Sequence, residues 1–273
     1  MDANLELKRV KEWGWMRGFA NLYRKESRAW WSTKRWWING LLWTVLVAGW
    51  VAVWVFIMPS LYAAAGSTVM TDLGGPLVMG LKMLFTIAGG MVIAIGLIVL
   101  CQDLIIGEKQ SGLTEWLLAN PVQRKAYVLA KLCASLVAVI LLLIVLPGAA
   151  AYGVLSLATG GPLALQPFLE GMGILVLHSL FYLTLTLMLG TFFGSRSAIL
   201  GIPLGILLTG MFFSGILKPL LYVSPWMLPQ LAEAVAGGVP VPAGLLWPPL
   251  LATGLWCLVF TCAALIKFER SEF

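Results

Sequence analysis

The side chains that most often carry catalysis or bind metals are few in this sequence, and their spacing does not group them. His178 is the single histidine, and it lies within a long apolar run without a second histidine or an acidic partner at a useful spacing. We interpret it as a packing or hydrogen-bonding residue rather than a ligand. The four cysteines form no CxxC pair and lie in or near apolar runs, as small apolar residues do: Cys101, Cys133, Cys257 and Cys262.

Catalytic and phosphate-binding motifs are also missing from the chain. The sequence contains no HExxH, no GxSxG and no GxxxxGK[ST], the motifs of zinc proteases, serine hydrolases and ATP-binding loops. We therefore expect no catalytic site, no metal site and no bound cofactor in this chain. No carboxylate lies at the centre of a long apolar run, and this disfavours a proton- or sodium-coupled carrier.

Polar residues are concentrated in the stretch GEKQSGLTEWLLANPVQRKAYVLAKL, residues 107–132, which connects two apolar runs. Gly112 permits a break in the chain, and Pro121 ends a short helix over about 113–119, because the residue before a proline is pushed out of the helical region. Three apolar residues share one face of that helix at three- and four-residue steps: Leu113, Trp116 and Leu117. This face needs a cover, which is the headgroup layer, the chain's own helices or a groove on a partner protein.

The elements that must hold this loop follow from the composition, which is 60% hydrophobic and only 11% charged. A soluble protein carries roughly a quarter charged residues. Six apolar runs approach or exceed the roughly 20 residues that a helix needs to cross a bilayer: 40–58, 83–103, 127–156, 168–193, 198–217 and 245–266. The alternating pattern of a barrel is absent. We predict an all-α integral membrane protein with six transmembrane helices in one membrane domain over residues 39–273.

Charge placement orients the predicted bundle. All but two of the 18 basic residues fall on one side, and the exceptions are Lys82 and Lys218. By the positive-inside bias that side is the cytoplasm, and both termini lie there. The net charge of +6 then reflects topology and attraction to anionic membrane lipids, and we do not expect nucleic acid as a partner.

Residues 1–38 are expected to form a separate cytoplasmic or interfacial amphipathic segment. One helical face is apolar and a second stripe is basic, with Trp13, Met16, Ala20, Tyr23 and Trp30 on the first and Arg17, Arg24 and Arg28 on the second. Such a helix can lie in the membrane surface, and packing on a partner protein is the alternative.

Two further patterns concern packing. A short apolar helix pattern around 226–236 is bracketed by prolines and is too short to cross, so we expect a re-entrant or surface-lying helix. The GxxxG pairs Gly190/Gly194 and Gly201/Gly205 permit close helix contacts, either within one chain or at a dimer seam.

The loop resembles the cytoplasmic loop of the type-2 ABC export permeases, the membrane subunits of ATP-driven exporters. The matching pieces are GEKQSG, the helix LTEWLL, the turn PVQR and the following Lys131. The segment KESRAWWSTKRWW, which begins with the pair Lys25 and Glu26, resembles the family's interfacial segment, and YVSPWMLPQLAEAVAGG resembles its outer segment. The tail KFERSEF is similar to the family's F-x-R-R-E-F ending, with Ser271 in place of the second basic residue.

The resemblance implies six spans per subunit and a substrate path along the interface between two permease subunits, which are two copies or a copy and a paralogue. It also implies two cytoplasmic ABC ATPase subunits, which would bind the ATP and magnesium, and the plasma membrane of a prokaryote. The residues it assigns to ATPase coupling are Glu108, Lys109, Gly112, Leu113, Thr114, Glu115, Trp116, Leu117, Pro121, Arg124 and Arg196. Those assigned to the interfacial helix are Trp13, Met16, Tyr23, Lys25, Glu26 and Trp30. In this interpretation Glu108, Lys109 and Glu115 form the polar rim of the ATPase contact.

One alternative from another class fits the same loop. A membrane anchor or sensor that transports nothing would also bind a cytoplasmic partner through it. A co-purified ATPase whose turnover responds to a substrate distinguishes a transporter from such a module.

Overall fold

The computed structural model describes residues 18–66, 74–112, 122–213, 216 and 218–270, and every regular element within them is a helix. Long apolar runs form helices because a helix bonds its own backbone groups without help from water. The all-α class predicted from the sequence is therefore confirmed.

Five helical runs are long and apolar enough to cross a membrane. They are Trp36–Ala64, Gly75–Gln110, Arg124–Thr159, Leu165–Phe192 and Ala243–Glu269. The first comprises most of α2 (Arg35–Ala52), then η1 (Val53–Ile57) and α3 (Met58–Ala64). The second comprises α5 (Gly75–Lys82), η2 (Met83–Ile93), α6 (Ala94–Cys101) and α7 (Asp103–Gln110). The third comprises α9 (Arg124–Val139), η3 (Ile140–Val145) and α10 (Leu146–Thr159), and the last two are α11 and α14.

The fifth predicted span, 198–217, corresponds to α12 (Arg196–Phe213), which has 18 residues. At 1.5 Å per residue its length is about 27 Å, slightly less than the roughly 30 Å hydrocarbon core. The predicted second span began at residue 83 and ended at 103, whereas the helical run extends from Gly75 to Gln110. Single charged residues such as Lys82, which is exposed, do not end a helix when they point away from the core.

Three of the spans contain π-helical segments, η1, η2 and η3. Such segments are rare and are frequently found at functional sites. The longest is η2, with 11 residues, and it packs against α13 (Leu228–Ala236) and α11. The π-helical geometry of the second span therefore coincides with its contact to the helix α13.

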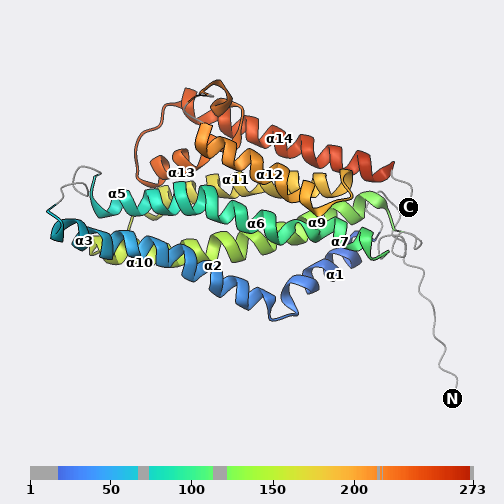
Figure 1. The fold of residues 1–273 in the computed structure, drawn as a ribbon, viewed down its shortest axis with the longest axis horizontal. Helices are drawn as coiled ribbons and strands as arrows, with labels where there is room; N and C mark the ends of the chain where they lie inside the picture. The colour runs from blue at the N-terminus through green and yellow to red at the C-terminus, as the bar shows by residue number, and fades with distance from the viewer. Residues whose placement is uncertain (1–17, 67–73, 113–121, 214–215, 217, 271–273) are drawn as a thin grey trace, which may run out of the picture.

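The predicted short helix around 226–236 is present as α13, preceded by the 3-10 turns η4 (Lys218–Tyr222) and η5 (Pro225–Met227). It packs on α11 and buries Leu228, Leu231 and Ala232. It does not cross the bundle: it lies at the same end as α3 and the start of α5 (Figure 1).

The opposite end of the bundle gathers α1 (Phe19–Trp31), α7, the start of α9 and the end of α14 (Figure 1). We call this the basic end, because Lys25, Lys109, Arg124, Arg196 and Lys267 lie on these elements and at the start of α12. The buried core between the two ends is formed mainly by η2, α6, η3 and α11. By contrast, α2 and α14 expose many large apolar side chains, among them Trp37, Leu46, Leu251 and Leu258. Such surfaces suit contact with lipid or another membrane helix.

The two ends of the bundle are expected to lie on opposite sides of the membrane. In a background with the exposed Cys262 replaced by serine, Ser111→Cys at the basic end should react with an impermeant maleimide only from the cytoplasmic side. Gly161→Cys, at the turn between α10 and α11 with open space beside it, should react only from the outside. Labelling of both cysteines from one side would contradict the arrangement.

Candidate functional site

The densest group of charged residues in the described chain lies at the basic end, where α1, α7 and α9 meet. It consists of Lys25 and Glu26 from α1, Glu108 from α7, and Tyr127 and Lys131 from α9. Tyr127 and Lys131 are four residues apart, so they share one face of α9. On α1, Glu26 lies one turn after Leu22, and both are buried. We call these five residues the charge cluster.

The two lysines of the charge cluster each bind both glutamates. Lys25 Nζ lies 2.6 Å from Glu108 Oε1 and 3.3 Å from Glu26 Oε1. Lys131 Nζ lies 3.0 Å from Glu108 Oε2 and 3.1 Å from Glu26 Oε2. The Tyr127 hydroxyl donates to Glu108 Oε2 at 2.6 Å, and its ring lies 5.1 Å from the Lys131 ammonium. Glu108 is therefore the shared partner of α1 and α9.

The charges of the cluster balance, and this makes its burial tolerable. The Lys131 side chain is only 2% exposed and that of Glu26 is 9% exposed. An unpaired ion at such a depth costs several kcal/mol, whereas here two cations face two anions. Burial lowers the pKa of Lys25, but the hydrogen bond to Glu108 and the charges of Glu26 and Glu108 outweigh it and raise that pKa above the usual value. The Lys25 ammonium therefore keeps its charge throughout the neutral range.

Two further contacts attach α7 to α11 and α12. Lys109 Nζ donates to the carbonyl oxygens of Gly190 and Thr191, at 3.2 and 2.9 Å, in the last turn of α11. A cation suits this position because the final carbonyls of a helix lack partners and carry a partial negative charge. At the surface, Arg196 Nε at the start of α12 lies 2.8 Å from Asp103 Oδ1.

The start of α9 is joined in the same way to the end of α14. Arg124 Nη1 donates to the Glu269 carbonyl oxygen at 3.0 Å, and Lys125 Nζ lies 3.2 Å from the Glu269 carboxylate. The ring of Tyr127 stacks on Phe268 at 5.0 Å between centroids. The connection between Gly112 and Val122 joins α7 to α9. Side-chain contacts bind these two helices to α1, α11, α12 and α14.

The structure brings together some of the residues selected from the sequence and not others. Lys25, Glu26 and Glu108 meet in the charge cluster, and Lys109, Arg124 and Arg196 form the contacts beside it. Gly112 has φ 70°, a left-handed conformation that favours glycine, as its predicted role at a break requires. Eight of the selected residues lie outside the described part of the chain: Trp13, Met16, Leu113, Thr114, Glu115, Trp116, Leu117 and Pro121.

The surroundings of Tyr23 differ from the predicted ones, whereas the place of Glu108 and Lys109 at the rim of a partner contact stays a prediction. Within this chain both Glu108 and Lys109 bind other helices. The face of α1 that the structure buries carries Leu22 and Glu26 rather than Tyr23, which is half-buried. The physical reason is that α9 presents Lys131 to α1, and a buried ammonium requires a carboxylate beside it.

Tyr127 and Lys131 were missed as site residues, although Lys131 belongs to the sequence pattern. The available indication was their four-residue spacing, which places a hydroxyl and an ammonium on one face of a helix that is mostly apolar after Lys125. No group of three histidine, cysteine or acidic residues that could hold a metal is found within the described ranges. The arrangement is suited to mechanical connection between helices.

The comparisons with known proteins identify one matching family. A family model described as "ABC-2 family transporter protein" matches residues 20–273. The match begins inside α1 and covers every helix that forms the charge cluster. The curated proteins gave no match.

Proposed function

The chain belongs to the ABC-2 transporter family, and from this premise we propose that it is the permease subunit of an ABC exporter. It is a multi-pass membrane component, and such components generally work with ATP-binding subunits. In our proposal a separate cytoplasmic ATPase hydrolyses the ATP, and this chain moves a substrate across the plasma membrane of a prokaryote.

The observation that supports coupling is the way the 113–121 connection is anchored. Its two flanking helices contact α1 and each other through Glu108, and they contact α11, α12 and α14 through Lys109, Asp103 and Arg124. A force applied to the connection therefore reaches six helical elements at once. ATP binding favours one arrangement of the ATPase, and differential binding of that arrangement to the permease would shift the helices as rigid bodies.

The assembly we propose contains two permease chains and two ATPase chains. Each ATPase subunit holds ATP and magnesium, and the basic end of the permease faces the cytoplasm. The surface of α12 around Gly201 and Gly205 is available for contact with a second permease copy or a paralogue. A Cβ added at either glycine would meet nothing within 4 Å. Close approach of a second membrane helix suits such a surface, whereas Gly190 already packs on Ile105 of the same chain.

An assembly experiment tests this function. The purified chain should turn over no ATP, because it has no phosphate-binding loop. Expressed with the ATPase encoded beside it, it should purify as a complex of two permease and two ATPase subunits, by mass photometry, with turnover that a transported compound stimulates. ATP hydrolysis by the chain alone would contradict the proposal. A stable complex whose turnover responds to no compound would favour the anchor or sensor interpretation.

A further inference from the structure

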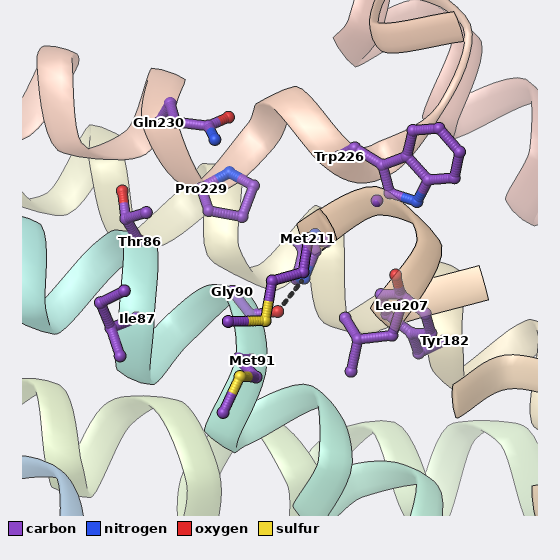
Figure 2. Close-up of a pocket in the computed structure, with 12 residues that line it drawn as sticks. Thr86, Ile87, Gly90, Met91, Tyr182, Leu207, Met211, Trp226, Pro229 and Gln230 are labelled. Carbon is purple, nitrogen blue, oxygen red and sulfur yellow. Dashed lines mark hydrogen bonds between the residues drawn. The ribbon is translucent and has the colours of Figure 1, made fainter. Parts of the chain in front are cut away.

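A cavity of about 270 Å³ lies between η2, α11, α12 and the segment η5–α13 (Figure 2). Its walls are mostly apolar, with Ile87, Met91, Leu207, Met211 and Pro229 among the lining residues. Thr86 and Gln230 lie toward one end in the view, and Tyr182 and Trp226 lie toward the other (Figure 2). An apolar cavity with a few polar groups is the usual form of a small-molecule site.

Tyr182 and Trp226 line the cavity and carry one hydrogen-bonding group each. Tyr182 on α11 is fully buried, and its hydroxyl, which has no hydrogen-bond partner among the described residues, has no surface open to a solute. A buried hydroxyl without a partner costs free energy, and most such groups in proteins are bonded. By contrast, the Trp226 indole N–H donates to the Ile206 carbonyl oxygen at 3.0 Å, so it is already satisfied.

The shape of the cavity is held by contacts between its walls. His178 places Nδ1 3.2 Å from the Pro225 carbonyl oxygen and Nε2 3.2 Å from the Gly90 carbonyl oxygen. It therefore spans from η2 to η5. Trp226 fits against α12 because Gly210 has no side chain, and a Cβ there would lie 2.1 Å from the indole ring. These contacts fix the positions of η2, η5 and α12 around the cavity.

A second cavity, of about 560 Å³, adjoins the first and shares Thr86 and Gln230 with it. Lys82 and Glu233 are among its lining residues, and Glu233 Oε2 accepts a hydrogen bond from Thr86 Oγ1 at 2.5 Å. The surroundings thus change from charged, beside Lys82 and Glu233, to apolar, beside Met91 and Leu207. A molecule that fits both has a polar head and a compact apolar body.

We propose that the cavity between η2, α11, α12 and α13 binds a compact amphiphilic solute, with its apolar body between Met91 and Met211 and its polar end beside Thr86 and Gln230. The volume of this cavity is near the lower limit for small-molecule sites, so a molecule of one or two rings fits and the two chains of a bilayer lipid do not. That the solute is the transported cargo rests on the function proposed above, whereas binding itself does not.

The probe for this site is 4-hydroxybenzophenone, a compact aromatic compound with a hydroxyl group. Its photoexcited ketone abstracts hydrogen from a nearby C–H group, and the two radicals combine into a covalent bond. The full-length permease, in phosphatidylcholine nanodiscs without ATPase, should be labelled at Met91 and Met211 in a saturable manner, as mapped by peptide mass spectrometry. Gln230→Leu should raise the half-saturating concentration about tenfold, the loss of one good hydrogen bond.

Two variants decide the outcome. Ile87→Phe fills the cavity from η2 and should abolish saturable labelling. Gln166→Leu is the matched control, because it removes an amide that donates to Glu170 Oε1 at 3.1 Å outside the cavity, and it should leave labelling unchanged. Labelling that does not saturate, or that survives Ile87→Phe in folded protein, would overturn the proposal. Because the nanodiscs already present phosphatidylcholine in excess, a site that holds this lipid would show no saturable labelling. None of these results depends on ATPase binding or transport.

Discussion

Replacement of Lys131 by methionine is expected to destabilise the folded protein by about 3–5 kcal/mol. The ammonium is almost completely buried and lies 3.0 and 3.1 Å from two carboxylates. Methionine fills a similar volume without the charge, so Glu26 and Glu108 would remain with Lys25 as their single cation. The measurement is the free energy of unfolding of the purified permease in detergent, from denaturant titration followed by tryptophan fluorescence.

A matched control and a rescue make this result specific to the charge cluster. Lys125→Met removes an exposed ion pair with Glu269, whose partners are 41% and 53% exposed, and it should cost no more than about 1 kcal/mol because solvent screens such pairs. Adding Glu26→Gln to Lys131→Met restores one anion facing one cation, so the double variant should regain part of the lost stability. If Lys131→Met cost no more than Lys125→Met, the cluster would not hold α1 in place.

The predictable part of the fold is the part governed by hydrophobicity. The spans at 127–156 and 245–266 fall within described helices, and the span at 168–193 extends one residue beyond the end of α11. Long apolar runs bond their backbone groups internally as helices. His178 was interpreted as a hydrogen-bonding residue, and its contacts with Gly90 and Pro225 agree. Local sequence decides such features.

The partners of charged residues were not predictable in the same way. Glu108 and Lys131 are 23 positions apart, and Lys25 lies on a helix that precedes the first span. Their meeting depends on how α1 crosses α9, which hydrophobic periodicity does not specify. The π-helical geometry of η2 was also not predictable from the sequence, because the run MLFTIAGGMVI is apolar around the whole helix and shows no periodicity. The cavity lies between η2 and α11, whose lining residues are about 90 positions apart in the sequence.

The charge cluster and the cavity lie on the same two helical runs. Glu108 and Lys109 end the run that also contains η2, and Lys109 binds the last turn of α11, the helix that carries His178 and Tyr182. Both principal walls of the cavity are thus fastened together at the basic end. In the proposed transporter, displacement of α7 by the ATPase would move η2 relative to α11 and change the cavity, even though the two sites share no residue.

Replacement of Trp116 by alanine is expected to weaken binding of the ATPase by roughly 30- to 1,000-fold. Trp116 is predicted on the apolar face of the short helix at 113–119, which lies outside the described residues, and in the proposed complex this face is the anchor that the ATPase covers. Central aromatic anchors at interfaces contribute about 2–4 kcal/mol, and each 1.4 kcal/mol is tenfold in affinity. The affinity can be measured with labelled ATPase and nanodisc-embedded permease, together with transport in vesicles.

Two further variants distinguish the role of Trp116 in binding the ATPase from the role of the helices α7 and α9 that flank it. Gln166→Ala, which removes only an exposed hydrogen bond to Glu170 at the opposite end, should leave ATPase binding unchanged. Glu108→Gln should bind the ATPase nearly as well as the wild type but transport less per ATP, because it loosens the contact between α7, α1 and α9 without touching the anchor. Trp116→Ala should instead fold and insert normally, since the residue lies outside the spans, while losing the ATPase. If Trp116→Ala bound the ATPase and transported at full rate, the 113–121 connection would be a membrane-surface helix, and the coupling contact would have to lie elsewhere on the basic end.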